Sequence, residues 1–256
     1  NLFKENNNVE DIQLLATELL NCVFHSSKTI CGTLDVLEEN KYDLILANPP
    51  YYQSGIITKE AKGKGFYTEG GTGVEGLFLE WIIKSLKVGG VANIVLPDGI
   101  MNNISNQKLR DYIIRTCYVE SIISLPLNTF FNTPKKTFVL TVTKKKDVNH
   151  KQNYPVFAYL CNSIGETLDV NRFDIDDNDF GEAVSKYVHY QKVSDKAHLP
   201  KFLEDAFALD KKLKFLNIDT FVSGDDWFID NRWSDDEKIE LGFKEKTNAM
   251  RSEEHT

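Results

Sequence analysis

The sequence predicts an α/β fold, and three observations favour it. Short apolar runs with the length of buried strands alternate with longer segments in which apolar residues recur at helical spacing. Glycine- or proline-containing turns close several of these runs. With 256 residues and 41% hydrophobic content, the chain can bury a sizeable core, and its length fits one large domain plus an appendage.

The predicted elements follow from these runs in chain order. The first residues have room for a strand ending near Lys4 and Glu5, a helix over 11–24 and a strand over 28–31. The elements predicted after them are a strand over 43–47, a helix over 77–87, a strand over 91–96, a helix through Leu109 and Tyr112, and strands over 119–126 and 137–143.

A polar stretch over 147–153 marks a boundary in the second half of the chain. We therefore predict a main domain over residues 1–149 and a C-terminal extension over residues 150–256. The extension is expected to begin with an edge strand and to continue with helical segments, over 156–161, 179–190 and 199–216.

The last part of the extension is polar but carries two tryptophans within residues 221–233. Exposed aromatic residues among acidic ones predict a contact with another domain or subunit. Ser234 followed three residues later by Glu237 predicts the capped start of a further helix.

Membrane and metal-binding classes of protein do not fit the composition. No stretch reaches the roughly 18 apolar residues of a membrane span, and no charged and apolar leader precedes a cleavage site. We therefore expect a soluble, cytoplasmic protein with no membrane partner. The cysteines lie far apart without Cys or His partners at metal-binding spacing, which predicts buried reduced thiols and no metal site. They are Cys22, Cys31, Cys117 and Cys161.

The most informative feature is the turn Asn48-Pro49-Pro50-Tyr51 at the end of the apolar run 43–47. Two successive prolines fix two φ angles and remove two N–H donors, so this turn only accepts hydrogen bonds. An exocyclic amine on a planar ring would donate one hydrogen to Asn48 Oδ1 and the other to the Pro49 carbonyl, while the ring stacks on Tyr51. Two acceptors on one nitrogen draw its lone pair out of conjugation and aim it at an electrophile.

An ordinary proline turn that closes a buried strand is the simpler interpretation of Asn-Pro-Pro. The full run with Tyr51 favours a functional turn, because it resembles the signature of amino-group methyltransferases that use S-adenosylmethionine. Such enzymes act on adenine N6, cytosine N4, RNA guanine or a protein glutamine. The turn therefore implies a reaction type and not a substrate.

Three further runs narrow the resemblance. The runs LKVGGVANIVLPDGI, IISLP followed by a phenylalanine, and KKTFVLTVTKKK are similar to the modification subunit of type I restriction systems and its fused type II relatives. The resemblance covers about residues 10–180 and implies a partial Rossmann-like methyltransferase sheet followed by a mixed or helical extension. It also implies transfer of a methyl group to adenine N6 in double-stranded DNA, with Asn48, Pro49, Pro50 and Tyr51 as the catalytic residues and the adenine flipped out of the duplex.

The same resemblance implies cofactor-binding residues. Asp35, beside Leu34 and a short connection before the catalytic strand, matches the acidic residue that accepts from the adenine amine of the cofactor. Glu5 matches the acidic residue that binds the ribose hydroxyls, although an exposed Glu beside an asparagine-rich loop is an alternative. Phe78 is a candidate to line the cofactor or base pocket, and its alternative is a core residue on a helix.

One family feature is missing before Asn48. The family cradles the cofactor with a glycine-rich loop after its first strand, and Gly70–Gly73, although glycine-rich, has no strand before it. We therefore expect the chain to be truncated at its N-terminus, to bind S-adenosylmethionine weakly and to be inactive by itself. Without the central strand, the strand over 43–47 is expected at the edge of one continuous sheet formed with the strands that follow it.

The implied partners are double-stranded DNA, a DNA specificity subunit or fused target-recognition domain, and a restriction subunit. The formal net charge of −8 and pI near 5.2 predict that another component supplies much of the grip on DNA. The loop over 52–73, which carries Lys59, Lys62 and Lys64, is the best candidate to meet an extruded base. The run Lys144–Lys146 is either a solvated strand end or a second basic contact.

Two other functions remain open at this point. A ribosomal RNA or release-factor methyltransferase shares the turn but is not expected to carry the IISLP and TFVLTV runs. The other alternative is a non-catalytic scaffold that binds a specificity protein and no cofactor.

Overall fold

The computed structural model describes residues 34, 36–51, 55–71, 73–130, 135–222 and 226–245. The chain divides into two compact units, Asn1–Val36 and Leu37–Thr256. Leu34, in the first unit, is buried. Glu5, Asp35 and the elements predicted before residue 34 lie outside the described residues.

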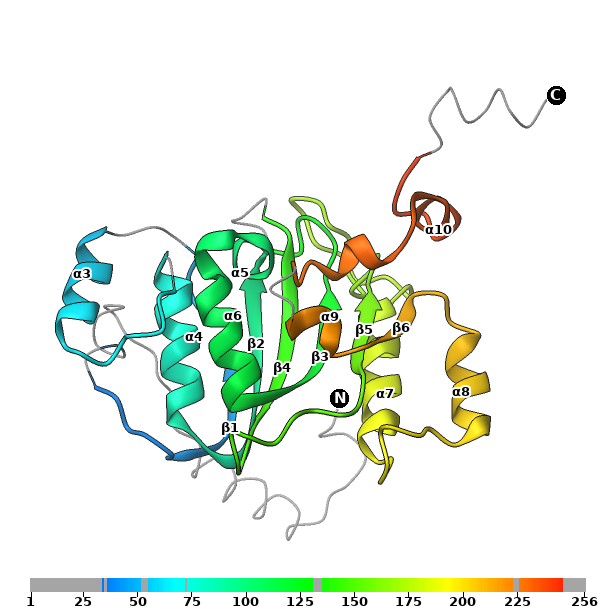
Figure 1. Cartoon of the computed structure of the whole chain (residues 1–256). Helices are drawn as coiled ribbons and strands as arrows, with labels where there is room; N and C mark the ends of the chain where they lie inside the picture. The colour runs from blue at the N-terminus through cyan, green and yellow to red at the C-terminus, as the bar shows by residue number, and fades with distance from the viewer. Residues whose placement is uncertain are drawn as a thin grey trace, which may run out of the picture. The chain divides into compact units, whose positions relative to one another are not determined.

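The second unit is built on a six-stranded sheet in the order β1-β2-β4-β3-β5-β6 (Figure 1). Strands β1, β2, β3 and β5 run parallel to one another, whereas β4 and β6 run antiparallel to their neighbours. The carboxyl ends of the four parallel strands therefore lie at one edge of the sheet, called the carboxyl edge below. The strands are β1 Tyr42–Ala47, β2 Leu86–Pro97, β3 Cys117–Ser124, β4 Thr137–Lys144, β5 Val156–Leu160 and β6 Leu213–Leu216.

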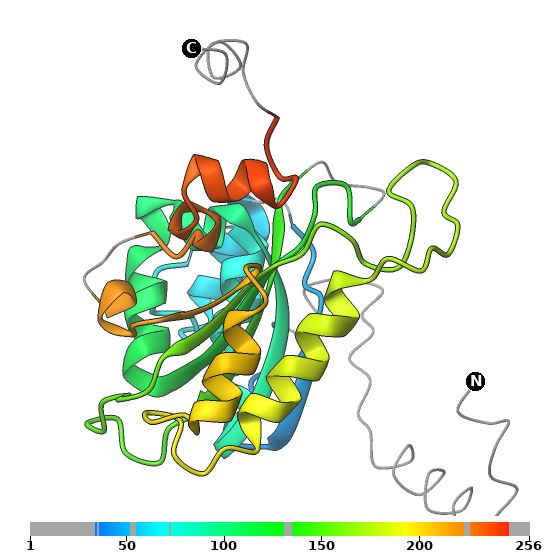
Figure 2. The ribbon, with the colours of Figure 1, turned by 90° about the vertical axis from the view of Figure 1, so that its right-hand side faces the viewer.

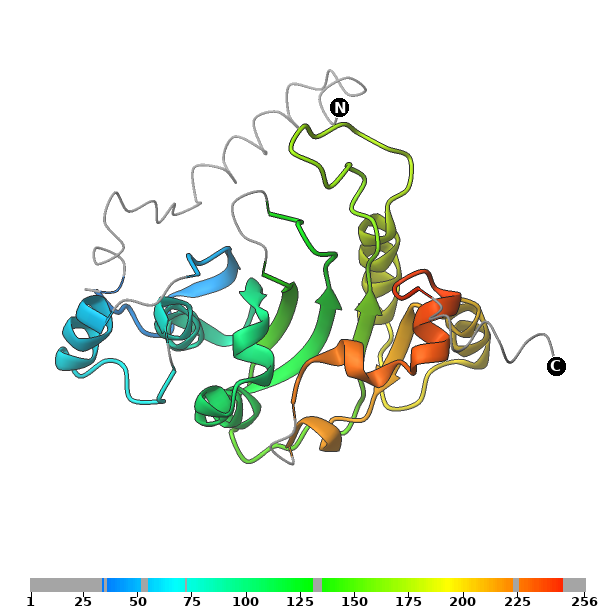
Figure 3. The same ribbon diagram turned by 90° about the horizontal axis from the view of Figure 1, so that it is seen from above.

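Helices cover both faces of this sheet. In the view from above, α5 and α6 lie on one side of the strands and α7 lies on the other (Figure 3). Helices α7 and α8 lie side by side (Figure 2). The helices are α3 Gly55–Gly63, α4 Gly73–Ser85, α5 Asp98–Asn102, α6 Gln107–Thr116, α7 Asp179–Gln191, α8 Lys201–Ala208, α9 Asp219–Val222 and α10 Asp235–Glu240, with 3₁₀ turns η1 Ile104–Asn106 and η2 Ile229–Arg232.

Strands β3 and β5 are buried on both faces, whereas β2 is buried mainly on one. On β2, Ala92, Ile94 and Leu96 are 0% exposed, with partly exposed residues between them. Register places Phe157 of β5 on the opposite face, where its ring centroid lies 6.0 Å from that of Tyr190 on α7. The apolar runs and periodic segments of the sequence thus form the two layers that this sheet needs.

The predicted strands and helices after residue 43 are confirmed up to residue 191. The continuous sheet is also confirmed, because β1 is followed by β2, β4 and β3, and among the described strands β1 is the first in this order. Cys117 and Cys161 are buried and free, as predicted, while the other two cysteines lie outside the described residues. In the described ranges, no helix has the length and apolar character needed to cross a bilayer.

Three expectations about secondary structure are wrong. The segment predicted as a loop over 52–73 contains α3, which carries Lys59 and Lys62. The helical spacing over 199–216 continues only through Ala208, because Leu213–Leu216 pairs with β5 as β6. Strand β5 is therefore not an edge strand, since it pairs with both β3 and β6. The boundary after residue 149 stays a prediction, and β5 and β6 beyond it extend the same sheet.

The two C-terminal tryptophans are buried, so the expectation that they are exposed for a partner is wrong. Trp227 and Trp233 are 1% and 2% exposed. The backbone N–H of Trp227 donates to the Met101 carbonyl of α5 at 2.8 Å, and Trp233 Nε1 donates to the Lys211 carbonyl at 2.8 Å. The polar segment therefore folds back onto the sheet domain. Ser234 forms the predicted capping box with Glu237 at the start of α10.

Candidate active site

The Asn-Pro-Pro-Tyr turn lies at the carboxyl edge, directly after β1. The last paired residue of β1 is Ala47, opposite Ile94 of β2. Pro49 and Pro50 lack N–H groups, so they cannot continue the hydrogen-bond ladder and the chain leaves the sheet here. Pro49 is buried, whereas the Asn48 side chain is exposed. The turn thus anchors a proline in the protein and presents an amide to solvent.

Tyr51 folds back from the turn toward the sheet. Its hydroxyl donates to Asn48 Oδ1, with 2.6 Å between the oxygens, and lies 3.2 Å from the carbonyl oxygen of Val95 on β2. The ring is partly buried. The turn is therefore a unit that follows β1, is closed by the hydrogen bond between Tyr51 and Asn48, and contacts β2 at Val95.

A buried carboxylate lies close enough to influence this unit. Glu75, in the first turn of α4, is 5% exposed. Burial, and after it the negative charge of Glu75, raise the pKa of Tyr51. The phenol therefore keeps its proton and remains a hydrogen-bond donor at neutral pH. The sequence did not predict that Glu75 lies near the turn, because this proximity depends on how α4 packs.

Of the four predicted cofactor-binding residues, Phe78 and Leu34 are described. Phe78 is half-buried on α4, between the fully buried Leu77 and Leu79. Asp35 and Glu5 lie outside the described residues. The roles of all four in cofactor binding stay predictions.

Glu80 on α4 binds the segment that precedes this helix, and the sequence pattern gave no indication of this role. Its carboxylate is 1% exposed and accepts hydrogen bonds from the backbone N–H groups of Thr68 and Glu69, at 2.8 and 3.1 Å, and from Lys84 Nζ at 2.7 Å. These bonds tie the segment between α3 and α4 to α4. The segment that follows the Asn-Pro-Pro-Tyr turn is thus held by a buried charge that backbone donors and one lysine compensate.

The basic run Lys144–Lys146 is mostly a structural element. Lys144 Nζ donates to the carbonyls of Lys84 and Leu86 at 3.2 and 2.8 Å, at the end of α4. Lys145 Nζ donates to the Ile114 carbonyl of α6 at 2.7 Å, and burial lowers the pKa of both lysines. Cations at helix C-termini bind unpaired carbonyls and interact favourably with the helix dipole. Only Lys146 of this run is exposed, so two of its three charges face protein carbonyls and not solvent.

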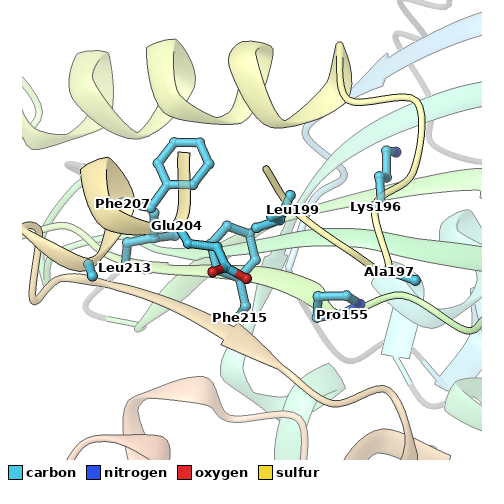
Figure 4. A pocket seen from close by; sticks show the side chains of 9 residues that line it. Pro155, Lys196, Ala197, Leu199, Glu204, Phe207, Leu213 and Phe215 are labelled. Carbon is cyan, nitrogen blue, oxygen red and sulfur yellow. The ribbon is translucent and has the colours of Figure 1, made fainter. Parts of the chain in front are cut away.

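Two cavities of the described part lie away from the turn. One, of about 260 Å³, is lined by side chains of α8, β6 and the segment before α8, including Glu204, Phe207 and Phe215 (Figure 4). The other, of about 520 Å³, lies at the carboxyl ends of β3 and β5 and includes Lys136 and Asp230, whose charged atoms are 3.2 Å apart. Neither is lined by a residue of the Asn-Pro-Pro-Tyr turn.

Comparison with known protein families shows which family the chain belongs to. A family model for N-6 DNA methylases matches residues 1–227. The chain belongs to this family. Among solved structures, this N-6 DNA methylase is similar to a protein from a study of complex assembly and conformational transition in a type I restriction-modification system. The two chains share 16% sequence identity with a TM-score of 0.52, and the match covers 84% of this chain and 44% of that chain. This likeness shows the fold.

Two modification subunits also resemble this N-6 DNA methylase chain. The methyltransferase subunit of a type I system from Streptococcus thermophilus has 21% identity and a TM-score of 0.48, with 75% of this chain and 38% of that chain covered. The M protein of the type I restriction enzyme EcoKI has 26% identity and a TM-score of 0.38, with 47% and 25% covered. The chain thus spans less than half the length of each of these proteins.

Proposed function

We propose that this member of the N-6 DNA methylase family is the catalytic part of a restriction-modification methyltransferase that methylates adenine N6 in double-stranded DNA. The observation that carries the proposal is the hydrogen-bonded turn at the carboxyl edge. It offers the exposed Asn48 amide oxygen beside a partly buried aromatic ring. In parallel α/β sheets, ligands bind outside the carboxyl ends of the strands.

The chemistry around the turn suits a cationic methyl donor. Asn48 and the two prolines offer acceptor oxygens, Tyr51 offers an aromatic face, and the buried Glu75 carboxylate adds negative charge nearby. S-adenosylmethionine, when bound, supplies an electrophilic methyl group. Asp35, Glu5, Leu34 and Phe78 are the residues that we propose to hold it.

The residues of the turn would then act on the nucleophile. Asn48 Oδ1 and the Pro49 carbonyl each accept one hydrogen of the adenine amine, which localises the nitrogen lone pair outside the ring plane. Tyr51 stacks on the flipped base and holds it near these acceptors. Proton loss needs no strong base in the turn, because the acidity of the amine rises steeply as it is alkylated. The turn therefore accelerates methyl transfer mainly by orienting the amine with fixed acceptors.

The proposed partners follow from the charge of the chain and from its family. With a net charge of −8, the chain needs a basic partner for much of its affinity for the DNA backbone. A DNA specificity subunit or fused target-recognition domain is the proposed source, with a restriction subunit completing the system. Lys59, Lys62 and Lys64, which are exposed on and after α3, are the proposed local contacts to the DNA near the flipped base.

The test is a single-turnover methylation assay with the complete methyltransferase, its specificity component and duplexes that contain the recognised site. We expect label from S-adenosylmethionine on adenine N6. Asn48→Ala should slow transfer on the order of 10²- to 10³-fold, because a preorganised acceptor is lost, with cofactor affinity nearly unchanged. Asn149→Ala, at an exposed turn on the opposite edge of the sheet, is the matched control and should transfer at the normal rate.

Near-normal transfer by Asn48→Ala would mean that the turn only closes a strand. Label on cytosine N4 would keep the reaction type and reject the proposed base.

A further inference from the structure

The contacts of the Tyr51 hydroxyl point to a role that base stacking does not require. Stacking uses only the ring face, yet the hydroxyl lies between two acceptors, Asn48 Oδ1 at 2.6 Å and the Val95 carbonyl at 3.2 Å. We propose that the Tyr51 hydroxyl is a positioning group that fixes the side-chain oxygen of Asn48 for the target amine. This inference rests on the proposed methyltransferase function.

Asn48 needs such a group because its amide is exposed and can rotate. The terminal torsion of an asparagine is broad and roughly two-fold, so a free amide presents its oxygen or its NH₂ group in the same direction. An NH₂ group at this place would face the donor hydrogens of the target amine and repel them. The proton of Tyr51 selects the oxygen. An amide oxygen has two lone pairs, so it accepts from Tyr51 and from the target amine at the same time.

The Val95 carbonyl keeps the hydroxyl in place. β1 and β2 are paired up to Ala47 and Ile94, so Val95 is the residue of β2 beside the start of the turn. The single hydroxyl proton serves the shorter contact to Asn48, and the carbonyl provides a second acceptor if the amide turns away. The hydroxyl thus always has a partner at this position, which limits the cost of burying it.

Protonation of the phenol is required for this role, since only the neutral hydroxyl donates. Burial and the Glu75 charge raise the pKa of Tyr51, so the hydroxyl is protonated and donates at neutral pH.

The experiment is a double-mutant cycle between Tyr51→Phe and Asn48→Ala in the complete methyltransferase with its DNA partner components. Tyr51→Phe keeps the ring for stacking and removes only the hydroxyl. Single-turnover methylation measures the rate, and the fluorescence of 2-aminopurine placed at the target position measures base capture. Tyr190→Phe is the matched control, because the Tyr190 hydroxyl donates to the Pro155 carbonyl at 2.8 Å, far from the turn.

We expect Tyr51→Phe to slow transfer roughly 3- to 10-fold, the effect of one net hydrogen bond, with base capture within about 2-fold of the parent protein. In the Asn48→Ala background the same change should cause no further loss, because the group it positions is gone. Tyr190→Phe should leave the transfer rate unchanged even where it lowers the melting temperature.

Three results would overturn the inference. They are a Tyr51→Phe rate within 2-fold of the parent protein, an equal loss in both Asn48 backgrounds, and a loss of base capture as large as the loss of rate. Failure of the proposed function has a different signature. In that case Asn48→Ala itself transfers at the normal rate, or the parent protein transfers no methyl group to DNA.

Discussion

Lys144 provides a direct test of whether the basic run at the end of β4 supports the fold or binds DNA. Lys144→Met keeps most of the apolar stem and removes the ammonium group. The ammonium donates to three oxygens, the Lys84 and Leu86 carbonyls and Asn40 Oδ1 at 3.0 Å, so each of its hydrogens has a partner. Its removal leaves the end of α4 without this cap.

The expected cost follows from these contacts. Hydrogen bonds from a charged group contribute about 1.5–3 kcal/mol in net terms, and water can replace part of the interaction because Lys144 is only half-buried. We therefore expect a loss of about 2 kcal/mol in the free energy of unfolding. For a unit of this size, each kcal/mol corresponds to roughly 2–4 °C, so the melting temperature should fall by roughly 4–8 °C.

The assay is thermal unfolding followed by circular dichroism, with Lys146→Met as the matched control. Lys146 is exposed, and its removal should change the melting temperature by less than about 1 °C, as for most surface substitutions. Equal melting temperatures for the two variants would refute the capping role. If Lys144 instead contacts phosphate, Lys144→Met would reduce the salt dependence of DNA binding by about one unit of slope and leave stability unchanged.

Two further predictions concern stability. Trp227→Ala should lower the free energy of unfolding by about 3–5 kcal/mol in urea titrations, because a large side chain that is 1% exposed leaves a cavity beside the Phe221 ring. A loss below about 1 kcal/mol would contradict its buried position. Burial, and then the hydrogen bond to Asp210, raise the pKa of Tyr159. Since unfolded tyrosine ionises near pH 10, the contribution of Tyr159 to the free energy of unfolding is complete below about pH 10 and is lost as pH rises further. Urea titrations between pH 8 and 11 should therefore show a fall in the free energy of unfolding, and this fall should be smaller in Tyr159→Phe.

The features that the sequence could predict are those whose cause is local. The run from Asp43 to Tyr51 contains its own strand, its own terminator and its own polar groups within nine residues, and each is found where it was expected. Ser234 and Glu237 likewise form their capping box from a spacing of three. In both cases the signal lies within a few residues: the Asn48–Tyr51 and Ser234–Glu237 hydrogen bonds each join residues three apart.

The features that could not be predicted depend on partners far along the chain. Lys144 reaches carbonyls 60 and 58 residues away, so its neighbours in sequence suggested a solvated basic run. The tryptophans of the C-terminal segment stand among acidic residues, yet the backbone N–H of Trp227 donates to the Met101 carbonyl of α5, more than a hundred residues earlier. Helical spacing over 199–216 also did not reveal that Leu213–Leu216 pairs with β5, because pairing with a neighbouring strand overrides local periodicity.

The structural and the chemical interpretations of the Asn-Pro-Pro-Tyr turn are not alternatives. Pro49 and Pro50 end the ladder between β1 and β2 because they have no N–H groups, and for the same reason their own backbone offers only acceptors at the carboxyl edge. Tyr51 then restores one contact to β2 with its side chain, at Val95, and this contact places a donor on Asn48 Oδ1. A turn that closed the strand with ordinary residues would offer donors as well as acceptors at this place. The property that terminates the strand is therefore the property that suits the turn to an amine.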